Sequence, residues 1–113
     1  MNTPEKYLEE VPNLSYILAL AKNDLDFKFQ FITRLKEEYA VDSLAYLYHM
    51  EVNEPRAASE IVNKLTYTLS FLSMREAYIF AERHQENLRM ANTNLHPQFN
   101  KILVTVHTFL CKI

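Results

Sequence analysis

The chain has no glycine among its 113 residues, although average usage of about 7% would supply roughly eight. Glycine serves tight turns, phosphate-binding loops and close approaches of the backbone to a ligand. Its absence excludes the glycine-rich fingerprints of dinucleotide-binding and P-loop proteins, and it disfavours folds that are rich in hairpins. The absence of glycine therefore predicts an all-α protein in which residues other than glycine form the links between helices.

Composition predicts a single globular domain over residues 1–113. Hydrophobic residues make up 49% of the chain and charged residues 23%, and this length suits one core. The net charge is −2, and lysine and arginine are scattered, so the basic stripe that nucleic-acid binding requires is missing. We expect no nucleic-acid partner.

A cytoplasmic location is expected from three features of the sequence. No apolar run approaches the ~18 residues of a membrane-spanning helix, so no membrane association is expected. The segment from Met1 to Glu10 is polar and acidic, unlike a secretory signal. Cys111 is the lone cysteine, which excludes an internal disulfide and fits a reducing compartment.

Start signals, stop signals and apolar periodicity divide the chain into helical segments. Thr3 and Pro4 predict a short helix through Glu10, and a second helix starts near Asn13. Asn23-Asp24 ends that helix and offers the cap of the next segment, a long helix or helical pair from Leu25 to about Val52 with a bend or change of phase at Val41-Asp42. The segments that follow are a helix opened by Pro55, a helix capped by Ser73 with Glu76 as its capping box, and a last helix from about Pro97. Short links between them favour antiparallel neighbours.

The expected core is formed by the apolar positions that recur at helical spacing. In the long helix these are Phe31, Ile32, Leu35, Tyr39, Leu44, Leu47 and Tyr48; after Pro55 they are Ala58, Ile61, Val62, Leu65, Leu69 and Leu72; further on they are Ala77, Tyr78, Ala81, Leu88, Phe99, Ile102, Leu103, Val106 and Leu110, with His84 or Gln85.

Residues Ala57 to Leu88 read AASEIVNKLTYTLSFLSMREAYIFAERHQENL. This stretch resembles the histidine phosphotransfer (HPt) family, whose members carry His-x-x-Lys-Gly-Ser, then Leu-Gly, then a helix rich in alanine, leucine and glutamate. With the preceding helices, the resemblance covers residues 12–110. It implies an up-down four-helix bundle with one or two short additional helices, and a partner that is a response-regulator receiver domain or a histidine kinase of two-component signalling.

The resemblance places Asn63 at the position of the phosphoacceptor histidine. A neutral imidazole nitrogen is a nucleophile, whereas the lone pair of an amide nitrogen is delocalised into its carbonyl. The lysine of the pattern falls on Thr66, and its two glycines fall on Tyr67 and Ser73. These four residues form a pseudo-active site, and we expect a non-catalytic protein without a cofactor rather than an enzyme.

The polar side of the same helix is expected to bind the partner. Its residues are Ser59, Asn63, Thr66, Tyr67 and Ser70. Tyr67 is of most interest, because an exposed tyrosine is a common interface anchor. Its alternative is a side chain that lies along its own helix with the hydroxyl in water.

Two other functions stay open. The first is phosphotransfer through a displaced histidine, for which His84 beside Arg83 is the candidate if it is exposed. The second is a self-associating structural bundle, and the sequence leaves the oligomeric state undecided. No metal site is expected, because His49, His84, His96 and His107 lack the spacing of metal ligands.

Overall fold

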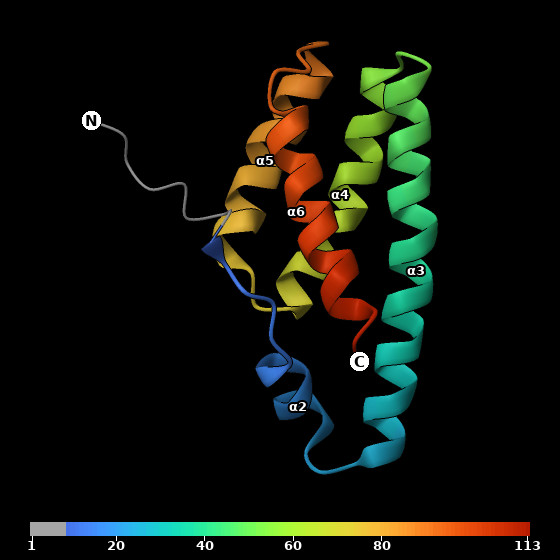
Figure 1. Ribbon diagram of the computed structural model, residues 1–113, viewed down its shortest axis with the longest axis vertical. Helices are drawn as coiled ribbons and strands as arrows, with labels where there is room; N and C mark the ends of the chain where they lie inside the picture. The colour runs from blue at the N-terminus through green and yellow to red at the C-terminus, as the bar shows by residue number, and fades with distance from the viewer. Residues whose placement is uncertain (1–8) are drawn as a thin grey trace, which may run out of the picture.

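The computed structural model describes residues 9–113 and contains five helices in that range: α2 (Ser15–Ala21), α3 (Leu25–Glu51), α4 (Pro55–Phe71), α5 (Arg75–Arg89) and α6 (His96–Leu110). Residues 9–113 include no strand, so the all-α prediction is confirmed. Helices α3 to α6 lie side by side, and α2 lies beside the N-terminal end of α3 (Figure 1). The helix predicted from Thr3 lies almost wholly outside the described residues.

The start signals of two helices act as the sequence predicts. The Asp24 carboxylate accepts a hydrogen bond from the backbone N–H of Phe27 at 3.0 Å and caps α3. Pro55 occupies the first position of α4, where its missing N–H costs no hydrogen bond. Both signals are local, which explains why the sequence alone reveals them.

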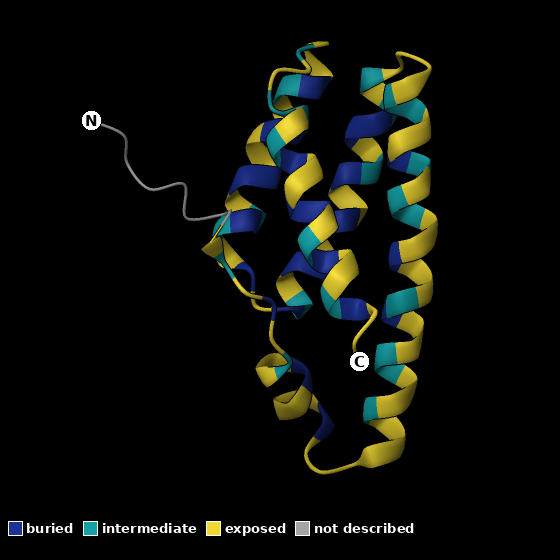
Figure 2. Ribbon diagram, in the orientation of Figure 1, coloured by how far each residue is buried: buried dark blue, intermediate teal, exposed yellow. Residues whose placement is uncertain are grey.

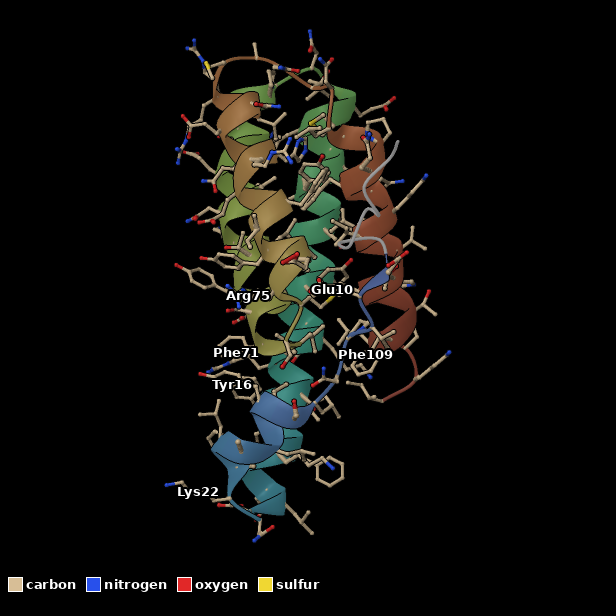
Figure 3. All side chains as sticks on the ribbon, turned by 90° about the vertical axis from the view of Figure 1, so that its left-hand side faces the viewer. Glu10, Tyr16, Lys22, Phe71, Arg75 and Phe109 are labelled. Atoms are coloured by element: carbon tan, nitrogen blue, oxygen red, sulfur yellow. The ribbon has the colours of Figure 1, made fainter. Side chains whose placement is uncertain are left out.

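Each helix from α3 to α6 turns buried residues toward the others (Figure 2). The largest of the wholly buried side chains are Tyr46 and Phe99. Aromatic contacts join the lower end of this core: the Phe71 ring of α4 stacks on Tyr16 of α2 at 6.0 Å and meets Phe31 of α3 edge-on at 4.9 Å. Tyr16 and Phe71 are labelled in Figure 3. These contacts hold α2 to the rest of the protein.

The second half of α3 departs from the expected core. The helix is continuous through Val41, and its buried residues are Leu35, Tyr39 and Tyr46. A step of seven residues, from Tyr39 to Tyr46, returns almost to the same side of a helix. Leu44 and Tyr48 belong to the expected apolar stripe but lie away from that side of the helix. They are therefore 69% and 61% exposed instead of buried.

Residues other than glycine take left-handed backbone conformations where helices end. Asn53, Ser73 and Ala91 have φ values of 59°, 61° and 59°, directly after the C-caps of α3, α4 and α5. At Ser73, the backbone N–H groups of Ser73 and Met74 donate to Ser70 and Leu69. This double hydrogen bond is the Schellman motif, in which glycine is the usual residue.

The predicted cap of α5 by Ser73 is wrong. The N-cap position is Met74, which makes no side-chain cap bond. The cap comes from Glu10, whose carboxylate accepts hydrogen bonds from the backbone N–H groups of Glu76 at 2.6 Å and Ala77 at 2.8 Å. Figure 3 labels Glu10 and Arg75, the first residue of α5. Ser73 is excluded as the cap because it continues the turn that ends α4.

Candidate functional site

Helix α4 packs against α3 on one side and α5 on the other. Its two covered flanks bury more positions than one apolar stripe would. The buried residues of α4 are Ala58, Ser59, Val62, Leu65, Thr66, Thr68 and Leu69. The exposed part of α4 is therefore narrower than the polar side that the sequence predicts.

Two of the five expected partner-binding residues do not belong to an exposed surface. Ser59 and Thr66 are only 3% and 4% exposed. Their hydroxyls donate to the backbone carbonyls of Arg56 and Asn63, each at 2.6 Å. These bonds satisfy the hydroxyls within the helix, so both side chains serve the packing of α4. The prediction of a shared exposed face is wrong for Ser59 and Thr66.

The other three residues form one exposed stripe along α4. Asn63, Tyr67 and Ser70 are all exposed, and their spacing of four and three residues places them on the same side of the helix. Tyr67 is 61% exposed, which fits the expectation of an accessible tyrosine. We call these three residues the Tyr67 stripe.

A groove of about 470 Å³ between α3 and α4 borders this stripe. Tyr67 and Lys64 lie on its α4 side, and its α3 side carries Glu37, Glu38, Val41 and Asp42. Burial raises the pKa of the Asp42 carboxyl, Lys64 opposes this shift, and Glu38 adds to it. The groove thus combines an acidic wall, one lysine and an exposed aromatic ring.

A second hollow, of about 330 Å³, lies at the turn between α4 and α5. It is lined by Ser70, Ser73, Met74, Arg75 and Tyr78. The Tyr67 stripe therefore reaches from the α3–α4 groove to this hollow. Sequence reasoning missed the α3 wall and Arg75, because a helical pattern does not reveal which neighbouring element lies alongside.

The displaced-histidine hypothesis requires an exposed His84, and the structure places this ring at 0% exposure. Its Nε2 lies 2.7 Å from the Tyr46 hydroxyl, which also lies 2.6 Å from His96 Nδ1. Burial, together with His96, lowers the pKa of His84 to about 4. A ring that is inaccessible from the surface cannot meet a phosphorylated partner, so burial excludes His84 as the displaced phosphoacceptor.

Within residues 9–113, no group of three or more His, Cys, Asp or Glu side chains is placed to hold a metal ion. Within the same residues, no helix combines the length and the apolar character needed to cross a membrane.

Comparisons of the chain with protein-family models, with curated proteins and with solved structures give no match. The interpretation of the Tyr67 stripe therefore depends on its residues and geometry.

Proposed function

We propose that this chain is a non-catalytic pseudo-phosphotransfer protein that binds a receiver domain or a histidine kinase through the Tyr67 stripe. In this proposal α3 to α6 form an up-down four-helix bundle of the HPt kind, with α2 as an additional helix, and the protein acts in the cytoplasm. Without phosphotransfer, its effects are competition with active modules, sequestration or scaffolding.

The observation that carries the proposal is the backbone of Ser73. The resemblance aligns Ser73 with the second glycine of the HPt pattern, and Ser73 has a φ of 61°. Glycine adopts this conformation without the steric cost that a Cβ atom brings. The same alignment puts Asn63 on an exposed part of α4, where a phosphoacceptor has to lie to reach its partner. Both positions support the register of the resemblance.

The residues around Asn63 favour binding without phosphate transfer. Thr66, at the position of the family's lysine, is buried and carries no charge to stabilise a phosphoryl group. Tyr67 puts a large ring where the family has a glycine that leaves room for the partner. A partner that binds here meets the Tyr67 ring, and burying such a ring is a frequent source of binding energy.

The experiment is a calorimetric titration of the purified protein against the receiver domains and histidine kinases of its own genome. Tyr67→Ala is expected to weaken binding about thirtyfold, as loss of an interface anchor does. Tyr48→Ala is the matched control, because Tyr48 is also 61% exposed but does not line the groove. Failure to bind any receiver or kinase, or equal weakening by both variants, would contradict the proposal.

Self-association is the second candidate, and an uncharged groove between α3 and α6 favours it. This groove of about 340 Å³ is lined by Tyr39, Ala40, Ser43, Leu44 and Leu47 of α3 and by Asn100, Leu103, Val104 and His107 of α6. No Asp, Glu, Lys or Arg lines it, so two copies can approach through the same surface without repulsion between like charges.

Sedimentation equilibrium tests the second candidate. Leu44→Glu is expected to convert a dimer to a monomer, because it places a charge in an apolar contact. Leu25→Glu is its control, since Leu25 is similarly exposed and lies outside the groove. A monomer at every concentration excludes this candidate and leaves the first one standing.

A further inference from the structure

The Tyr46 hydroxyl joins three helices inside the protein. It belongs to α3 and lies 2.7 Å from Nε2 of His84 on α5 and 2.6 Å from Nδ1 of His96 on α6. Tyr46 and His84 are wholly buried, while His96 is partly buried and is the first residue of α6. The Phe99 ring packs against both Tyr46 at 5.2 Å and His84 at 4.9 Å.

The number of available protons restricts how these three groups can bond. A hydroxyl has one proton, so Tyr46 donates to one ring nitrogen and accepts from the N–H of the other ring. Nδ1 of His84 is buried and has no hydrogen-bond partner. If Nδ1 carried the proton, it would be a buried N–H donor without an acceptor, which folded proteins rarely tolerate. A bare Nδ1 with an unpaired lone pair avoids this. The favoured arrangement therefore has His84 Nε2–H donating to Tyr46 and Tyr46 donating to His96 Nδ1.

An added proton breaks this arrangement. If His96 Nδ1 takes up a proton, the Tyr46 hydroxyl loses its acceptor inside a buried site. Burial raises the pKa of Tyr46, so the hydroxyl keeps its own proton. The new positive charge also lies at the N-terminus of α6, where the helix dipole disfavours it. Proton uptake thus removes a hydrogen bond and adds an unfavourable charge.

Within residues 9–113, no carboxylate forms a hydrogen bond or an ion pair with His84 or His96 to offset that charge. The groups that titrate at the cluster are Tyr46 of α3, His84 of α5 and His96 of α6, and none of the buried residues of α4 carries a titratable group. His49 of α3 is paired with Glu54 at 2.8 Å. The other charged residues of nearby segments are exposed: Glu51, Arg56, Glu60, Glu82, Arg83, Glu86 and Lys101.

We propose that Tyr46, His84 and His96 form a proton-operated latch, which fixes the first turn of α6 to α3 and α5 while both histidines are neutral and releases that turn on proton uptake. Burial lowers the pKa of His96, and burial together with His96 lowers that of His84 to about 4. Opening restores the ordinary pKa of both rings, so acid favours the open form. The latch is independent of the proposed signalling function.

Amide hydrogen exchange tests the latch. When the pH falls from about 7.5 to about 5, local opening over residues 99–103 is expected to become about thirtyfold more frequent. The lowering of the pKa of His84 from 6.5 to about 4 is by itself enough for this increase. This opening should depend little on denaturant, whereas Leu65 of α4 should exchange through global unfolding. If Leu65 and residues 99–103 exchange with the same free energy and the same denaturant dependence at about pH 5, the latch is refuted.

Substitutions identify the groups that respond to protons. His84→Gln and His96→Gln each remove one titrating ring, and each is expected to reduce the pH effect; His96→Gln decides if the other variant does not fold. Tyr39→Phe is the matched control, because it removes the 2.6 Å bond from Tyr39 to the Leu103 carbonyl, which involves no histidine. His107→Gln controls for an exposed histidine of α6. A pH effect that survives both cluster variants, or that disappears with either control, overturns the proposal.

Discussion

The carboxylate of Glu10 accepts a hydrogen bond from the backbone N–H of Ala77 at 2.8 Å, across a separation of 67 positions. Helix α5 has no capping side chain of its own, so Glu10 satisfies two N–H groups that its first turn leaves free. The backbone N–H of Asn13 donates to the Leu72 carbonyl at 3.0 Å and secures the same segment. An early part of the chain is thus tied to the turn between α4 and α5.

Glu10→Ala is expected to lower the free energy of unfolding by about 1 to 2 kcal/mol, because it removes a cap and a favourable charge at a helix N-terminus. Chemical denaturation measures this change. Glu9→Ala is the control, since Glu9 is exposed and makes no such bond. Equal losses in the two variants would show that Glu10 does not stabilise α5.

Ala91→Gly is expected to raise the free energy of unfolding by about 1 kcal/mol. Ala91 has a φ of 59°, where a Cβ atom is strained and glycine is not. Ala40→Gly, at an exposed position within α3, should instead lower it by about 1 kcal/mol. Thermal unfolding of both variants checks the opposite signs, and a destabilised Ala91→Gly would contradict the strain at this link.

Acid should destabilise the whole protein through His84. Its pKa is lower in the folded protein than in the unfolded chain, so the stabilisation by the neutral ring is complete above about pH 6.5 and is lost as pH falls toward 4. The loss amounts to about 3 kcal/mol at most. Urea unfolding of the wild type and of His84→Gln across this range isolates the effect, because carboxylates titrate in both proteins. Parallel pH profiles would contradict the assignment to His84.

Nuclear magnetic resonance of the imidazole nitrogens should reveal different tautomers at the two buried rings. His84 is expected to carry its proton on Nε2, and His96 is expected to have a bare Nδ1 that accepts from Tyr46. The measurement is a long-range nitrogen–proton correlation at neutral pH. A bare Nε2 on His84 would reverse the direction of the chain of hydrogen bonds.

Most of the helices could be predicted from the sequence, because their signals are local. Asp24, Pro55 and the apolar spacing from Phe99 to Leu110 each act within one or two turns of their own helix. The absence of glycine indicated the fold class correctly, but it did not reveal that Ser73 and Ala91 would take glycine-like backbone conformations. Those conformations arise from how the helices are joined.

The surface and the buried polar cluster were harder to predict, because both depend on contacts between helices. The sequence predicted that Ser59 and Thr66 lie on the polar surface, but the packing of α3 and α5 on two sides of α4 buries them. Tyr46 and His84 are 38 positions apart, and periodicity does not show that their side chains meet. Asn63, Tyr67 and Ser70 were predicted correctly to lie on an exposed side of α4, since neither α3 nor α5 covers these three residues.

The burial pattern of α3 also sets where this helix loses its structure first. None of residues 25–34 is fully buried, whereas Tyr46, near the other end, is enclosed completely. A helix of 27 residues is about 40 Å long, so its two ends lie in very different surroundings. We therefore expect fraying to start at Leu25 and to advance toward Leu35, so that α3 contains both segments that melt early and segments that melt late.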